Sequence, residues 1–162
     1  MLDATNLPIA LENTRLRLLS ELDADAYAAG TKDEAVRRFA HLPEPDYTPE
    51  SVRRMICDEV ATGLSSGTLA VLALADAETN RFVGSMVLFD VSSDAAEVGF
   101  WIHPGARGEG HARRGLELAS RFARTSGLKT LTARTLPENK ASQHCLTTVS
   151  YTHLRAHETD SY

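Results

Sequence analysis

The sequence of 162 residues has little of what marks the specialised classes of protein. It holds only two cysteines, Cys57 and Cys145, which are too few and too far apart for a disulfide framework or a zinc knuckle. No apolar run approaches the roughly 20 residues that cross a bilayer. The first residues lack the basic segment of a signal peptide. These absences predict a reduced, cytoplasmic protein with no membrane partner.

Positive charge is also in short supply. The chain has 17 basic and 22 acidic residues and a formal net charge of -5. Proteins that bind nucleic acid usually carry a basic surplus, so no nucleic-acid partner is expected. The length favours one domain with a core that needs no disulfide or metal for support.

The hydrophobic pattern predicts a mixed α/β domain. Alternation predicts strands, and apolar residues spaced by three or four predict helices. The first half of the chain gives a strand at Thr14 to Ser20, helices at 24–30 and 33–41, and a helix from Pro49 that ends at Gly63. The second half gives strands at 69–74, 81–90 and 97–102, a helix at 112–126, a strand at 128–135 and a helix after Pro137.

The most informative segment is the glycine-rich loop in IHPGARGEGHA, residues 102–112, which joins a strand to an amphipathic helix. The first N–H groups of a helix lack intrahelical acceptors and lie at the positive end of the helix dipole. Gly108 and Gly110 let the backbone approach a ligand closely, and Arg107 adds a charged donor. This combination predicts a phosphate site.

Two common nucleotide motifs do not fit this loop. Arg113 stands where the dinucleotide fingerprint needs its third glycine, and Leu116 and Glu117 replace the Lys and Ser/Thr of a P-loop. An α/β domain that binds another nucleotide by its phosphate stays an alternative.

The loop does fit the pattern R-x-x-G-x-A, formed by Arg107, Gly110 and Ala112. Here the sequence resembles the Gcn5-related N-acetyltransferase (GNAT) superfamily, and most closely its branch that acts on ribosomal-protein N-termini. The stretches ENTRLRLLSELDADA, RFVGSMVLFD, AAEVGFWIHPGARGEGHA and PENKAS carry the resemblance in family order, over roughly residues 12–147.

The resemblance implies an α/β fold with a GNAT-like mixed central sheet, helices on both faces and the last two strands missing. It implies acetyl-CoA as co-substrate and no metal. The cofactor would lie where strands 97–102 and 128–135 splay apart. Backbone groups of Ile102 and His103 would bind its pantetheine arm, flanked by Asn139 and Ser142. The pyrophosphate would sit on Arg107, Gly108, Gly110, His111 and Ala112.

The resemblance also implies direct acetyl transfer, which needs a base for the amine and an acid for the thiolate. Glu97 is the candidate base, with a solvated or salt-bridged strand-end carboxylate as the alternative. His103 is expected to be a loop residue rather than a base. Arg113 and Arg114 are expected at a solvated helix start, with contacts to the CoA phosphates as the alternative. Trp101 is expected to serve packing.

The acceptor is expected to be a primary amine, on a protein N-terminus or a small molecule. Glu44 and Asp46 could attract a cationic amine, although exposed loop acids are common. An alternative is a catalytically inactive module that binds acyl-CoA, and pairing of two copies as a homodimer stays open.

The last residues depart from the family pattern. Val149 to Glu158 can be back-translated as GTC TCT TAT ACA CAT CTC CGA GCC CAC GAG, which resembles a transposase sequencing adapter. Residues 1–148 are therefore expected to form an acetyltransferase domain incomplete at its C-terminus, and 149–162 a non-native tail outside the fold. Strand 128–135 would then be an exposed edge, the family's tyrosine acid would be missing, and the chain would be unstable and weakly active or inactive.

Overall fold

The computed structural model describes residues 1–40, 42, 44–135 and 154–158. The strands are β1 (Ile9–Leu11), β2 (Thr14–Leu18), β3 (Ala70–Asp76), β4 (Phe82–Phe89), β5 (Ala95–Ile102), β6 (Thr130–Thr135) and β7 (Leu154–Glu158). The helices are α1 (Ala24–Gly30), α2 (Glu34–Phe39), α3 (Pro49–Met55), α4 (Ala61–Ser66) and α5 (His111–Thr125), with a π-helical turn at Ile56–Val60 and short 3-10 turns at Ala4–Asn6, Glu21–Asp23 and Pro104–Ala106.

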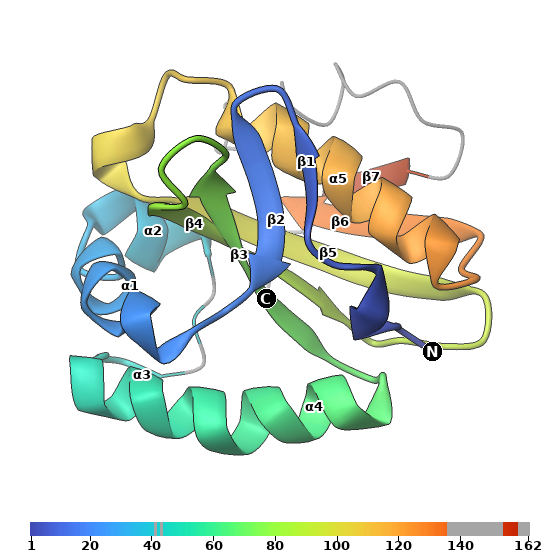
Figure 1. Ribbon diagram of the computed structural model, residues 1–162, viewed down its shortest axis with the longest axis horizontal. Helices are drawn as coiled ribbons and strands as arrows, with labels where there is room; N and C mark the ends of the chain where they lie inside the picture. Colours follow the sequence, from blue (N-terminus) through green and yellow to red (C-terminus); the bar gives the residue numbers. More distant parts are fainter. Residues whose placement is uncertain (41, 43, 136–153, 159–162) are drawn as a thin grey trace.

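All seven strands form one sheet in chain order, β1 to β7 (Figure 1). Neighbours are antiparallel from β1 to β5, whereas β5 pairs with β6, and β6 with β7, in parallel. The parallel pair β5–β6 is joined by a crossover through α5, as a parallel connection requires. The mixed sheet predicted from the sequence is confirmed.

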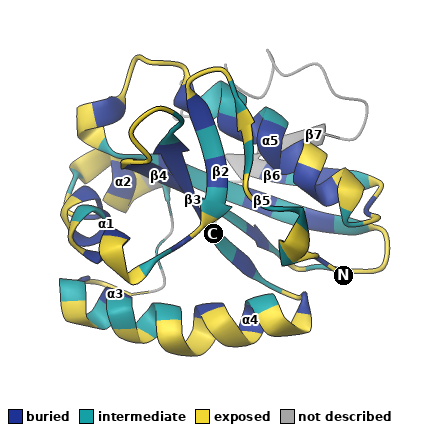
Figure 2. Ribbon diagram, viewed as in Figure 1, coloured by how far each residue is buried: buried dark blue, intermediate teal, exposed yellow. Residues whose placement is uncertain are grey.

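Each face of the sheet carries its own core (Figure 2). On one face, α5 packs Leu116, Ala119 and Phe122 against alternate residues of the central strands. On the other, α1, α2 and α3 cover a cluster that includes Trp101. The helices therefore lie on both faces, as expected, and the packing role of Trp101 is confirmed.

The helix after the proline-rich loop begins as predicted and ends later. Thr48 and Ser51 form a reciprocal capping box around Pro49. The predicted end at Gly63 is wrong, because the helix continues to Ser66 and Gly67 caps it with φ of +74°. Gly63 is instead a close-packing position, where an added Cβ would meet the side chain of Leu69.

Two strands were not predicted. β1 is only three residues long and forms a hairpin with β2 through a turn at Glu12, whose φ is +52°. β7 runs parallel to β6, from Leu131 opposite Leu154 to Thr135 opposite Glu158. The assignment of residues 149–162 to a non-native tail stays a prediction, but the expectation that β6 is an open edge is wrong among the described residues. The physical reason is that the unpaired N–H and C=O groups of an edge strand accept another strand readily.

Candidate functional site

The parallel strands β5 and β6 separate before β5 ends. Their pairing begins at Ala95 opposite Thr130 and stops at Val98 opposite Ala133, although β5 continues to Ile102. The last four residues of β5 thus have a strand partner, β4, on one edge only among the described residues. This opening lies at the carboxyl end of β5, the end from which the chain leads into the glycine-rich loop.

The hydrogen bonding of β5 decides which backbone groups face this opening. The N–H of His103 donates to the carbonyl of Val83 at 2.8 Å, so the N–H at position 103 points toward β4. Backbone groups of successive residues in a strand point to opposite edges, and those of Phe100 and Ile102 therefore point toward the β6 side. The sequence predicted that backbone groups of Ile102 face the opening, but it did not predict this for Phe100. The hydrogen bond between His103 and Val83 identifies Phe100, because the direction of the backbone groups alternates along β5.

His103 does not supply the free backbone groups that were expected of it. Its N–H is used by Val83, and its carbonyl accepts from the N–H of Ala106 at 2.9 Å. The imidazole Nδ1 accepts from the N–H of Gly105 at 3.1 Å. Burial is the main cause that holds the pKa of His103 below its usual range, with smaller contributions from two nearby arginines. The ring is thus a neutral cap on the turn that follows β5.

The glycine-rich loop has the backbone conformation that its glycines allow. Gly108 and Gly110 both have φ of +83°, a region that side chains disfavour. Gly110 is the N-cap of α5, and no side chain caps the helix there. His111 and Ala112 form the first turn of this 15-residue helix. The loop therefore presents uncapped N–H groups at the positive end of a long helix dipole.

Arg107 links this loop to the opposite layer. Its Nη2 forms an ion pair with Oδ2 of Asp33 at 2.5 Å, while 45% of the arginine side chain remains exposed. Asp33 also caps α2 by accepting from the N–H of Val36. The hydrogen bond from Arg107 is the main reason that the pKa of Asp33 lies below its usual range. Arg107 thus stands at the loop with its charge partly satisfied.

The ring of His111 faces the core rather than the loop surface. His111 is 2% exposed, and its Nδ1 lies 2.8 Å from Oγ1 of Thr14 on β2. The Thr14 hydroxyl donates to Oδ1 of Asn13, so it accepts from the imidazole. Burial lowers the pKa of His111. Only the backbone of His111 is therefore available to a ligand at the helix start.

The two arginines that follow in α5 point in different directions. Arg113 approaches Glu117 one turn along the helix at 3.9 Å. Arg114 turns back to the β1–β2 hairpin, where Nε lies 3.3 Å from Oε2 of Glu12 and Nη1 lies 3.0 Å from Oδ1 of Asn13. The expected solvated start of the helix is wrong for Arg114, whose side chain is 17% exposed.

Glu97 lies next to the point where β5 and β6 separate. It is opposite Phe89 on β4 and Thr132 on β6, one residue before the last pair. Alternation puts it on the same face of the sheet as Trp101, under the helical layer. Its Oε2 atom is buried. Glu97 is thus a partly buried carboxylate near the opening, not a solvated strand end.

Of the other residues that the sequence singled out, three lie outside the described residues and three are exposed. Asn139, Ser142 and Cys145 lie outside the described residues. Glu44 and Asp46 are exposed loop residues, and Cys57 is exposed. Among the described residues no group of His, Cys, Asp and Glu could hold a metal ion. No helix in that same part of the chain is long and apolar enough to cross a membrane.

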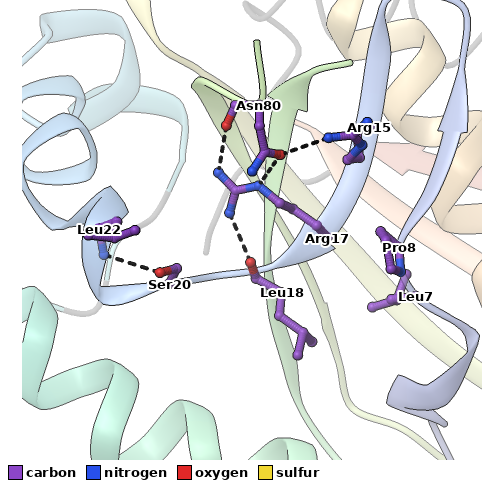
Figure 3. Close-up of a pocket in the computed structure, with 8 residues that line it drawn as sticks. All are labelled: Leu7, Pro8, Arg15, Arg17, Leu18, Ser20, Leu22 and Asn80. Atoms are coloured by element: carbon purple, nitrogen blue, oxygen red, sulfur yellow. Dashed lines mark hydrogen bonds between the residues drawn. The ribbon is translucent and has the colours of Figure 1, made fainter. Parts of the chain in front are cut away.

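A hollow of about 520 Å³ lies elsewhere, beside β2 (Figure 3). It is lined by Leu7, Pro8, Arg15, Arg17, Leu18, Ser20, Leu22 and Asn80. Arg17 there forms a bidentate ion pair with Asp23, with both N···O distances 2.8 Å. Two strands, β3 and β4, separate this side of the sheet from β5, so the hollow is distinct from the opening beside β5.

Comparison with known proteins places this geometry in a family. Residues 13–151 match the acetyltransferase (GNAT) domain. No curated protein matches the chain. RimJ of Mycobacterium smegmatis, solved in complex with CoA-disulfide, is 19% identical over 83% of this chain and 68% of its own, with a TM-score of 0.73.

Two further solved structures are similar. A ribosomal-protein-S5-alanine acetyltransferase from Vibrio fischeri is 16% identical over 89% of this chain and 82% of its own, with a TM-score of 0.75. RimL, a ribosomal L7/L12 α-N-protein acetyltransferase in complex with coenzyme A, is 16% identical over 86% and 80%, with a TM-score of 0.74. At these identities the likeness shows a common fold.

Proposed function

The chain belongs to the acetyltransferase (GNAT) domain family, and from this premise we propose that it transfers an acetyl group from acetyl-CoA to a primary amine. The observation that carries the proposal is the opening beside the end of β5, which leads directly into an uncapped helix start. In acetyl-CoA the pantetheine arm that carries the thioester is joined to a pyrophosphate. The opening and the helix start follow each other in the same order along this chain.

Backbone groups of this chain fit acetyl-CoA as the donor of the acetyl group. Backbone N–H and C=O groups of Phe100 and Ile102 would hydrogen-bond the amides of the pantetheine arm. The N–H groups of Gly108, Gly110, His111 and Ala112 would bind the pyrophosphate, with Arg107 beside them. Acetyl-CoA supplies an activated acyl group whose carbonyl carbon accepts the amine.

Glu97 is the residue proposed to handle the proton of the amine. In the transfer a C–N bond forms and the C–S bond breaks, so a proton leaves the nitrogen and another reaches the thiolate. A carboxylate near the opening accepts the first proton directly or through a water molecule. A backbone N–H fixed in the opening would stabilise the developing oxyanion. No described residue is assigned as the acid.

The acceptor is proposed to be a protein N-terminus or a small-molecule amine. The structures of ribosomal-protein acetyltransferases that resemble this chain support a protein acceptor. Calorimetric titration with CoA tests whether the chain binds the donor. A mass-spectrometric screen of acetylated peptides and small amines tests whether it acetylates a primary amine. Binding without turnover would favour an inactive acyl-CoA-binding module, and no binding by well-folded protein would overturn the proposal.

A further inference from the structure

The carbonyl of Glu109 in the glycine-rich loop accepts hydrogen bonds from two side chains. Nη1 of Arg114 donates to it at 2.7 Å, and Nδ2 of Asn13 donates to it at 3.3 Å. Nη1 of Arg114 also donates to Oδ1 of Asn13 at 3.0 Å, so the two side chains brace each other. The loop is thus attached to the β1–β2 hairpin, about one hundred residues earlier in the chain.

This attachment has a consequence for the next N–H group. In a trans peptide the C=O of one residue and the N–H of the next point in opposite directions. Because the Glu109 carbonyl points toward the hairpin, the N–H of Gly110 points away from it. That outward side is where the anion site proposed above lies, beside the uncapped start of α5.

The packing at Gly110 agrees with this arrangement. A Cβ added to Gly110 would collide with Nη1 of Arg114, whereas a Cβ added to Gly108 would meet nothing within 4 Å. The guanidinium of Arg114 therefore lies directly against the Gly110 backbone. Glu12, which accepts from Nε of Arg114, completes the support on the hairpin side.

We propose that Arg114 and Asn13 are positioning residues that turn the Gly110 N–H toward the pyrophosphate of CoA. The proposal rests on the function proposed above. Arg114 contributes through the backbone it holds, not through its charge. Arg113 offers a matched control, because it carries the same charge one residue earlier and contacts Glu117 instead of the loop.

The test measures the dissociation constants of CoA and of 3′-dephospho-CoA by calorimetry for the unchanged protein, Arg114→Met and Arg113→Met. We expect Arg114→Met to weaken binding of both ligands by about tenfold or more, since hydrogen bonds to charged groups are strong. Arg113→Met is expected to change the dissociation constants less than about threefold, because exposed charges contribute little.

Three results would overturn the proposal. Equal losses in both variants would mean that charge alone matters, and a loss confined to CoA would mean that Arg114 contacts the 3′-phosphate directly. No binding by the unchanged, folded protein would overturn the proposed function as well. If Arg114→Met does not fold, Asn13→Ala removes the second donor to the same carbonyl; weaker binding of both ligands supports the proposal, and unchanged binding contradicts it.

Discussion

Nδ1 of His111 lies 2.8 Å from Oγ1 of Thr14, although the two residues are 97 positions apart. Both are buried, so this hydrogen bond fixes the first turn of α5 to β2 inside the core. Thr14→Val keeps the shape of the side chain but leaves the imidazole N–H without its acceptor. We expect a loss of about 1–3 kcal/mol in the free energy of unfolding.

Denaturant unfolding checks this expectation, with Thr14→Ser as the control that keeps the hydroxyl. If Thr14→Val and Thr14→Ser are equally destabilised, the hydrogen bond is not what stabilises the contact.

The same histidine predicts how stability depends on pH. Burial lowers the pKa of His111 in the folded protein below its ordinary value of 6.5. The positive charges of Arg114 and Arg81 lower this pKa further, whereas the negative charges of Glu109 and Asp76 raise it. Between these two pKa values the unfolded chain binds more protons than the folded one, so acidification favours unfolding. The contribution of the neutral ring is complete above pH 6.5 and is lost as the pH falls toward the folded-state pKa.

Unfolding curves between pH 8 and pH 5 for the unchanged protein and His111→Gln measure this effect. We expect a steeper loss of stability on acidification in the unchanged protein. Parallel curves would show that His111 does not titrate differently in the two states.

The ion pair between Arg107 and Asp33 predicts a gain in cofactor affinity. Asp33→Asn removes the carboxylate that competes for the guanidinium, while asparagine still caps α2 well. An exposed ion pair contributes at most about 1 kcal/mol, so CoA is expected to bind up to about fivefold more tightly. Calorimetry measures this change, and weaker binding would indicate that the pair holds Arg107 in place for the phosphate.

Glu97→Gln separates catalysis from binding. The amide keeps the size of the side chain but cannot accept the proton, so kcat is expected to fall by about 100- to 10,000-fold. The affinity for CoA is expected to stay unchanged. Steady-state acetylation assays with calorimetry test both statements, and an unchanged kcat would remove Glu97 as the base.

Gly108→Ala and Gly110→Ala form a matched pair in the loop. Both replacements meet φ of +83°, so both are expected to destabilise the fold by about 1–2 kcal/mol. Only the methyl group at position 110 displaces Arg114. CoA affinity is therefore expected to fall more in Gly110→Ala, as measured by calorimetry, and equal affinities would contradict this account of the loop.

Much of the fold could be predicted because local patterns determine it. The strand at Thr14, the helix start at Pro49 and the glycine-rich loop each depend on neighbouring residues, and the structure contains all three. The hairpin partner β1 was missed because three residues are too few to show an alternation. β7 was missed because its place depends on an edge that β6 offers, not on its own sequence.

By itself, the sequence determined the order of the elements from β2 to β6 and the place of the uncapped helix start that is proposed to bind phosphate, because glycine backbone freedom and hydrophobic periodicity act over a few residues. Only the tertiary structure decided which groups surround that site. The register of β5 on β4 turned Phe100 and Ile102, and not His103, toward the opening. Contacts with distant residues directed Arg107 to Asp33 and Arg114 to Asn13. Long side chains contact the groups that lie near them in space, and residues far apart in the sequence come near one another only after the chain has folded.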